Sequence, residues 1–189
     1  MITHLTVGLL GANCYIVACK KTREAVVIDP GGDAVRIASE ITKKALLVRC
    51  ILNTHGHWDH TGANEELRKI AHAPLLIHRL DARGLKRPPD GHLEDGQEVR
   101  FGTWTLKVLH TPGHTPGGVC LSGPGVVFTG DTLFAGSIGR TDMPGGSYES
   151  LIRSVREKLF PLGDEVRAYP GHGPATTIGT ERQHNPFFR

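Results

Sequence analysis

Four side chains that can bind a metal ion stand close together in one short segment, Thr54-His55-Gly56-His57-Trp58-Asp59-His60. The near-continuous apolar run from Leu46 to Leu52 precedes them, and it has the length of a buried strand that ends at this cluster. Imidazole nitrogens and a carboxylate oxygen are ligands that zinc, iron and manganese accept. On an extended turn, His55 and His57 point to the same side and can bind one ion. Asp59 and His60 can reach a second ion where the chain starts to coil.

Three further segments place a potential ligand just after a strand-like run. His114 lies in a turn bounded by glycine and proline, Asp131 follows the apolar run 126–129, and His172 stands in Tyr169-Pro170-Gly171-His172-Gly173. Strand ends along one edge of a sheet converge in space, and loops at such an edge are the usual location of catalytic groups. This convergence argues against the alternative that residues 54–60 form only a histidine-rich surface loop.

The potential ligands divide into two sets that share one carboxylate. We expect His55, His57 and His114 on a first divalent ion, Asp59, His60 and His172 on a second, and Asp131 between the two. Zinc is the expected metal, with iron and manganese as alternatives. Two such ions, about 3.5 to 4 Å apart, can hold a water molecule and bring its pKa from about 15.7 toward about 7. The pattern predicts a hydrolytic site that needs no serine or cysteine nucleophile, with Asp59 and Asp131 as its catalytic carboxylates.

Hydrophobic periodicity predicts a mixed sheet covered by helices, in one domain over residues 1–189. Apolar residues at helical spacing predict three helices, at 33–45, 62–71 and 147–160. Short apolar runs predict strands at 13–19, 25–28, 46–52, 74–78, 99–101, 104–109, 119–121, 126–129 and 166–169. The polar, Pro- and Gly-rich segment 83–96 predicts an exposed loop.

Composition excludes several classes of partner. The 22 basic and 19 acidic residues are interspersed and leave a net charge of +3, too little to indicate binding to nucleic acid or to an anionic membrane. No apolar run approaches the roughly 20 residues of a membrane span, and the N-terminus does not resemble a signal peptide. We therefore expect a soluble, cytoplasmic protein whose four cysteines are buried, reduced thiols. The sequence leaves the oligomeric state open.

The motif from Thr54 to Gly62, together with His114, Asp131 and His172, resembles the metallo-β-lactamase superfamily over nearly the whole chain and in the expected order. The resemblance implies an α/β fold, a four-layer αββα sandwich with the metals at the open edge of its two sheets. Two branches of the superfamily differ from this chain. Flavodiiron proteins have a glutamate where this chain has His57, and many β-lactamases have a cysteine where it has Asp131.

Within the superfamily, the chain is most similar to short bacterial type II glyoxalases (hydroxyacylglutathione hydrolases). The similarity lies in the segment 129–142 and in the C-terminal segment from Pro170 to Pro186. It implies hydrolysis of the thioester S-D-lactoylglutathione, a small-molecule substrate, to lactate and glutathione. Larger glyoxalases of this type have a C-terminal helical domain with basic residues for glutathione, and we expect no such domain here. Arg140, in the glycine-rich loop 136–146, is the candidate for substrate binding, with a structural salt bridge as the alternative.

A second function of the same fold stays open at this point. The segment Gly139-Arg140-Thr141-Asp142 also resembles persulfide dioxygenases, which use a single iron. That resemblance would place the iron on His55, His114 and Asp131. A metal-binding scaffold without turnover, a lactonase or a nuclease are further alternatives, because fold and metals do not set the substrate. Of the remaining histidines, only His110 stands near a motif residue, and we expect it to be structural or to support a metal ligand.

Overall fold

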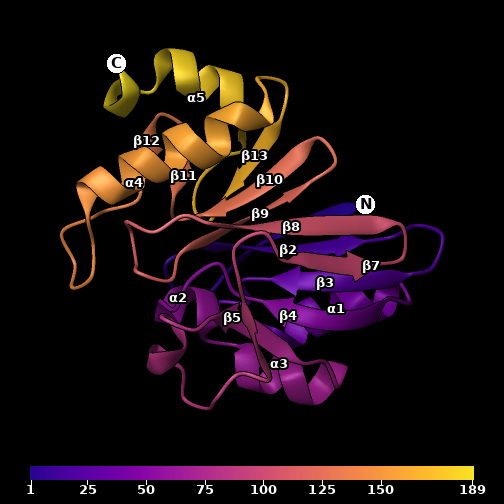
Figure 1. Cartoon of the computed structure of the whole chain (residues 1–189). Helices are drawn as coiled ribbons and strands as arrows, with labels where there is room; N and C mark the ends of the chain where they lie inside the picture. Colours follow the sequence, from indigo (N-terminus) through magenta and orange to yellow (C-terminus); the bar gives the residue numbers. More distant parts are fainter.

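The computed structural model describes all 189 residues and contains two six-stranded mixed sheets that pack face to face (Figure 1). In the first sheet the strands follow one another in chain order. The first three strands are antiparallel and the following ones are parallel. The strands are β1 (Ile2–Val7), β2 (Ala12–Ala18), β3 (Glu24–Ile28), β4 (Leu47–Leu52), β5 (Leu75–His78) and β6 (Gly91–Leu93).

The second sheet has the order β14-β13-β10-β9-β8-β7, and only its β10–β13 pair is parallel. Since β8 and β10 are both antiparallel to β9, the carboxyl ends of β8, β10 and β13 meet at one edge. The strands are β7 (Glu98–Phe101), β8 (Trp104–His110), β9 (Val119–Gly123), β10 (Val126–Gly130), β13 (Arg167–Pro170) and β14 (Thr176–Thr177). A small hairpin of β11 (Leu133–Phe134) and β12 (Ser137–Ile138) follows β10.

Helices cover the outer face of each sheet (Figure 1). The helices α1 (Ala34–Lys43) and α3 (Asn64–Ala71) pack on the first sheet, and α4 (Tyr148–Ser154) and α5 (Ile178–His184) pack on the second. The short helix α2 (Trp58–Thr61) begins six residues after the end of β4. The layers are therefore α/β/β/α, which confirms the predicted four-layer sandwich.

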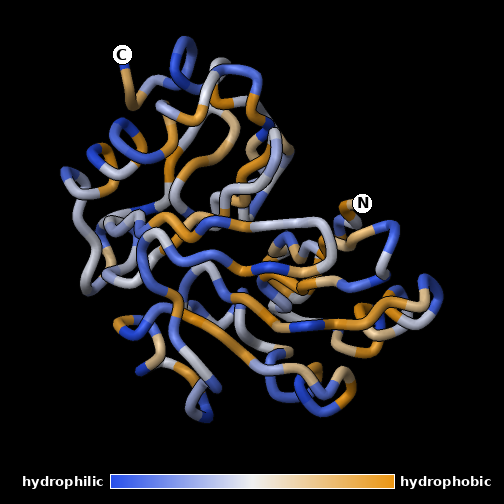
Figure 2. The backbone as a smooth tube through the Cα atoms, turned by 45° about the vertical axis from the view of Figure 1, so that its right-hand side comes forward, coloured by the Kyte–Doolittle hydropathy of each residue, from blue (hydrophilic) through white to orange (hydrophobic).

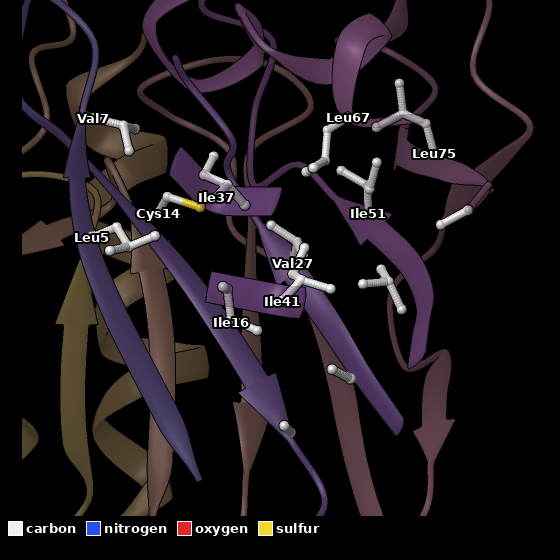
Figure 3. Packing of buried hydrophobic residues seen from close by; sticks show 14 residues of the cluster. Leu5, Val7, Cys14, Ile16, Val27, Ile37, Ile41, Ile51, Leu67 and Leu75 are labelled. Atoms are coloured by element: carbon white, nitrogen blue, oxygen red, sulfur yellow. The ribbon is translucent and has the colours of Figure 1, made fainter. Parts of the chain in front are cut away.

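Three apolar clusters hold the layers together, and strand β2 shows how alternation builds them. Cys14 and Ile16 face α1, where they pack with Ile37 (Figure 3). Tyr15 and Val17 point to the opposite side, into the cluster between the two sheets. A third cluster lies between the second sheet and its helices. Hydrophobic stretches follow the strands, while hydrophilic residues gather at the turns and on the helices (Figure 2). Successive side chains of a strand face opposite sides, so the double-sided burial of β2 requires a cover on both faces.

Most predicted elements are confirmed to within two residues, and the differences have local causes. Strand β6 lies inside the segment predicted to be a loop, because its three residues are too few to show periodicity although Leu93 is fully buried. The predicted helix 147–160 holds its α-helical form only to Ser154 and continues as a wider turn over Val155–Leu159. Five elements were not predicted: strands β1, β11, β12 and β14 and helix α5. Strand β1 lies at the edge of its sheet, and the other three strands have only two residues each.

Two further expectations can be compared with the structure. All four cysteines are buried and unpaired, as predicted. None of the helices has the length and the hydropathy that a membrane crossing needs.

Candidate metal centre

The structure brings all seven predicted ligands to one edge of the two sheets. The segment with His55 and His57 follows β4, and α2 carries Asp59 and His60. His114, Asp131 and His172 stand in the loops that follow β8, β10 and β13. The positions follow from topology, because these three strands of the second sheet run in the same direction and end together.

The first cluster consists of His55, His57 and His114, each of which offers a nitrogen within 4.8 Å of the others. His57 Nδ1 and His114 Nε2 lie 2.9 Å apart. His55 is buried, and its Nε2 has no hydrogen-bond partner. A buried nitrogen without a partner is unfavourable, whereas a cation bound by its lone pair would satisfy it.

The second cluster consists of Asp59, His60 and His172, whose ligand atoms also lie within 4.8 Å of one another. His172 Nε2 lies 3.2 Å from His60 Nε2 and 3.1 Å from Asp59 Oδ2. His60 is completely buried, while the other two side chains are partly exposed. The nitrogen and oxygen atoms of all three residues thus converge on one point that solvent can reach.

Asp131 lies between the two clusters and turns one oxygen toward each. Its Oδ1 is 3.4 Å from His60 Nε2, and its Oδ2 is 3.5 Å from His114 Nε2. The Oδ1 atom is buried and accepts no hydrogen bond. Together with the orphaned nitrogen of His55, this oxygen shows that the donor set fits two cations that share a carboxylate, the arrangement expected from the sequence.

Hydrogen bonds at the outer nitrogens orient three of the imidazoles. His114 Nδ1 donates to the carbonyl oxygen of Arg140 at 2.8 Å, which leaves the lone pair of Nε2 free for a metal. His60 Nδ1 donates to Asp29 Oδ2 at 3.1 Å. The Thr54 hydroxyl donates to the same oxygen at 2.6 Å, so its own oxygen accepts from His55 Nδ1 at 3.1 Å. Each ring is therefore held in the tautomer that aims Nε2 at the cluster.

Two buried aspartates that sequence reasoning missed hold the loops of the potential ligands in place. Asp29 accepts the Thr54 backbone N–H at 2.7 Å as well as the donors of Thr54 and His60, so both of its oxygens are already engaged. Asp81 accepts the backbone N–H of Gly56 at 2.9 Å and that of Gly117 at 2.6 Å. Asp29 follows a strand directly, as Asp131 does, and this position could have indicated it. No spacing in the sequence points to Asp81.

Close backbone packing completes the centre at Gly171. A Cβ atom at this position would lie 2.3 Å from Asp131 Oδ1 and 2.7 Å from His60 Cε1. No side chain fits there without displacing a predicted ligand, so only glycine allows the loop before His172 to approach so closely.

The pKa values of histidines in the two clusters are shifted in opposite directions. Burial holds the pKa of His55 well below its usual value, and burial also lowers the pKa of His57. Burial opposes the charge on His60 too, but the hydrogen bond and charge of Asp29, with the charges of Asp131 and Asp59, raise its pKa to about 9. The hydrogen bond with Asp59 raises the pKa of His172. In the absence of bound ions, the histidines of the second cluster therefore bind protons more tightly than those of the first.

A pocket of about 490 Å³ opens above the two clusters. Its floor consists of His57, Asp59, His114, Asp131 and His172, and its walls consist of Leu10, Trp58, Phe134, Ile138, Arg140 and Met143. Its volume lies in the range of small-molecule sites, so a substrate would have direct access to the predicted ligands.

Comparison with known proteins agrees with this geometry. A family model described as the metallo-beta-lactamase superfamily matches residues 7–172. The chain belongs to this superfamily. Hydroxyacylglutathione hydrolase GloC of Haemophilus influenzae is 37% identical over 93% of this chain and 92% of its own length.

Two solved structures of superfamily members are similar over almost the whole chain. The crystal structure of the B3 metallo-β-lactamase BLEG-1 has a TM-score of 0.95 at 36% identity and covers 100% of this chain and 99% of its own. The protein TTHA1623, crystallised in a di-iron-bound form, has a TM-score of 0.86 at 37% identity and covers 98% and 99%. These likenesses confirm the superfamily fold that the sequence motifs implied.

The structure gives Arg140 and His110 different surroundings. Arg140 lines the pocket, but its guanidinium donates two hydrogen bonds of 2.8 Å to Asp142, the salt bridge that the sequence left as an alternative. This pairing lowers the pKa of Asp142 to about 2. His110 lies outside both clusters, where its ring stacks on His78 and its Nε2 donates to the carbonyl of Pro116 at 3.0 Å. A role of Arg140 in substrate binding stays a prediction.

Proposed function

We propose that this chain is a binuclear metal-dependent hydrolase that cleaves a thioester, S-D-lactoylglutathione or a related hydroxyacyl thioester. The observation that carries the proposal is Asp131, whose two oxygens face two separate sets of three potential ligands. The superfamily match and the relative named hydroxyacylglutathione hydrolase support the choice of hydrolysis and of a thioester. The proposal treats residues 1–189 as one catalytic domain.

In the proposed centre, each side chain has a defined task. His55, His57 and His114 would hold one ion, Asp59, His60 and His172 would hold the other, and Asp131 would bind both. Zinc is the proposed metal, and the di-iron form of the relative TTHA1623 supports iron as the alternative. Two bound divalent ions supply hydroxide at neutral pH and positive charge beside the thioester carbonyl.

The residues around the pocket support water as the nucleophile. No serine, cysteine, threonine or lysine lines the pocket, and the aspartates and histidines on its floor are all predicted metal ligands, so no further side chain there offers a covalent nucleophile. Attack by water on the carbonyl carbon breaks the carbon–sulfur bond and yields a carboxylic acid and a free thiol. Asp59 and Asp131 keep partly exposed carboxylate oxygens at the pocket floor, where they can accept a proton or a hydrogen bond from that water.

Release of free thiol from S-D-lactoylglutathione by protein with two zinc ions per chain tests the proposal. We expect Asp131→Ala to lose at least one ion and most of the rate. Asp95→Ala is the control, because it also removes an aspartate carboxylate, one that accepts the His110 N–H at 2.8 Å and lies outside both clusters. Loaded wild-type protein that hydrolyses no thioester faster than buffer does would refute the proposed activity.

The alternative of a mononuclear iron persulfide dioxygenase uses only part of this centre. His55, His114 and Asp131 would hold its iron, and the second set of convergent ligand atoms, from Asp59, His60 and His172, would hold no ion. The second cluster therefore favours the hydrolase. Oxygen consumption with glutathione persulfide by protein that holds one iron per chain would reverse this choice.

A further inference from the structure

Exposed apolar side chains gather around the pocket. Ten large hydrophobic side chains of the protein are exposed, and three of them, Leu10, Trp58 and Met143, line this one pocket. Leu10 and Trp58 are each 58% exposed, and Met143 is 37% exposed. Phe134 and Ile138 complete the wall from the β11–β12 hairpin. Apolar side chains that converge in solvent on a concave site are typical of ligand recognition.

The part of this wall that carries Leu10 is held firmly in place. Leu9 and Leu10 form the tip of the β1–β2 hairpin, between Gly8 and Gly11. The Gly8 backbone N–H donates to Asp33 Oδ2 at 3.1 Å, and a Cβ on Gly32 would lie 2.7 Å from the Cα of Gly8. The tip thus packs backbone against backbone on the loop before α1. Leu10 is therefore presented to the pocket by a fixed support.

The same loop fixes the tip relative to the predicted ligands. A Cβ on Gly31 would lie 1.5 Å from the carbonyl oxygen of Asp59, so this glycine packs directly on the start of α2. The hairpin tip, the loop 31–32 and the segment with Asp59 consequently form one stack. An apolar group that contacts Leu10 would therefore lie beside the predicted ligands on the pocket floor.

Apart from the predicted metal ligands, the pocket has few groups that could bind a charged substrate. Arg140 is the only lysine or arginine in its lining. That guanidinium is engaged in two hydrogen bonds with Asp142. A glutathione thioester has two carboxylates and one ammonium group. Removing these charges from water is unfavourable, and the pocket wall has no matching set of partners to compensate for it.

We infer that the pocket recognises an uncharged, apolar substituent beside the thioester bond, and that the carboxylates of a glutathione thioester would stay outside it in solvent. This inference rests on the proposed function and names its substrate class. Leu10, Trp58 and Met143 provide the specificity, because burying them against an apolar group removes their surface from water. A volume of about 490 Å³ accommodates a group of the size of a benzyl or hexanoyl chain above the centre.

Matched pairs of thioesters test the inference and distinguish the two sides of the bond. On the thiol side, S-benzyl thioacetate is compared with S-acetylglutathione. On the acyl side, the hexanoyl thioester of N-acetylcysteamine is compared with its acetyl thioester. After correction for the uncatalysed rates, we expect kcat/KM to be about tenfold higher for the apolar member of at least one pair. Equal or lower values in both pairs would overturn the inference.

Two variants of the hairpin tip separate recognition from a general effect on folding. Leu10→Ser should lower kcat/KM for the preferred apolar substrate about tenfold more than it lowers kcat/KM for the acetyl thioester of N-acetylcysteamine. Leu9→Ser is the matched control, since Leu9 is 93% exposed at the same tip and does not line the pocket. The control should leave both substrates within about twofold. Equal losses in the two variants would overturn the role of Leu10.

A binding measurement keeps the inference separate from the proposed activity. Methyl benzyl sulfide, which cannot be hydrolysed, is titrated into zinc-loaded protein while the tryptophan fluorescence is followed, to which Trp58 in the pocket wall contributes. We expect saturable quenching in the wild type and in Leu9→Ser, with affinity about tenfold weaker in Leu10→Ser. No thioester hydrolysis together with this binding pattern would refute the proposed function and leave apolar recognition standing. Thioester hydrolysis without this binding pattern would refute apolar recognition alone.

Discussion

Replacement of Asp81 by alanine tests how the two loops of the first cluster are held together. One loop carries His55 and His57, and the other carries His114. The Asp81 carboxylate joins them, because it accepts the N–H of Gly56 at 2.9 Å and the N–H of Gly117 at 2.6 Å. The carboxylate is 7% exposed, so water cannot easily replace it.

The expected magnitude follows from these two hydrogen bonds. A hydrogen bond to a charged group contributes about 1.5 to 3 kcal/mol, and two of them contribute about 3 to 6 kcal/mol if they are independent. Because the freed loops can relax toward water, we expect Asp81→Ala to lower the free energy of unfolding by about 3 kcal/mol. Loss of such a support typically weakens metal binding about 10- to 100-fold. The loss of metal affinity should affect mainly the ion of the first cluster, since Asp81 makes no hydrogen bond to Asp59, His60 or His172.

Titration of the ion-free protein with Co²⁺ provides the assay, because the visible bands of the two sites can be followed as each fills. Denaturant unfolding of the same samples gives the stability. Asp95→Ala serves as the control, since its carboxylate accepts the His110 N–H and pairs with Lys158 away from the centre. The control should leave both cobalt affinities unchanged. If Asp81→Ala lost stability while both affinities stayed at the wild-type value, or fell equally, the proposed link to the first cluster would be wrong.

Two further predictions concern the second cluster and the shared carboxylate. Gly171→Ala should displace Asp131 or His60 and reduce metal affinity by more than about tenfold, while Gly91→Ala, whose Cβ would meet its nearest atom, Leu76 Cδ2, at 3.5 Å, should retain two ions by elemental analysis. Normal metal content in Gly171→Ala would contradict the packing argument. Since the pKa values of His60 and His172 are both raised, that of His60 to about 9, ion binding at pH 7.5 should release at least one proton, which calorimetry in buffers of different ionisation enthalpy measures. By the same linkage, His60 stabilises the ion-free protein fully below pH about 6.5 and loses this effect as the pH rises through about 9. No dependence of the binding enthalpy on the buffer would count against a protonated His60.

The fold could be predicted where the burial of one face of an element gives the apolar residues a clear periodicity in the sequence. Strand β4 and helix α1 each have an unbroken apolar pattern, and both were predicted to within two residues. Strand β6 could not be predicted, because three residues in a polar segment have no measurable period and only the partner strand β5 defines them. Similarly, the π-helical turn after Ser154 keeps the apolar spacing of an α-helix closely enough that the sequence cannot distinguish them.

The convergence of the seven potential ligands could be predicted because these residues are chemically unusual and stand at strand ends. Asp29 and Asp81 differ in this respect, since they act by accepting backbone and side-chain hydrogen bonds from segments more than twenty residues away. An aspartate in a loop is common for many reasons, so its partners become known only from the fold. The apolar pocket wall was missed for the same reason, because Leu10 and Met143 come together only in three dimensions.

Anomalous X-ray diffraction from crystals of zinc-loaded protein tests the central claim most directly. The account predicts two anomalous peaks at the shared edge of the sheets, with one oxygen of Asp131 bonded to each ion and the remaining ligands divided into the two clusters. A single peak on His55, His114 and Asp131, or a second ion that makes no bond to Asp131, would contradict it.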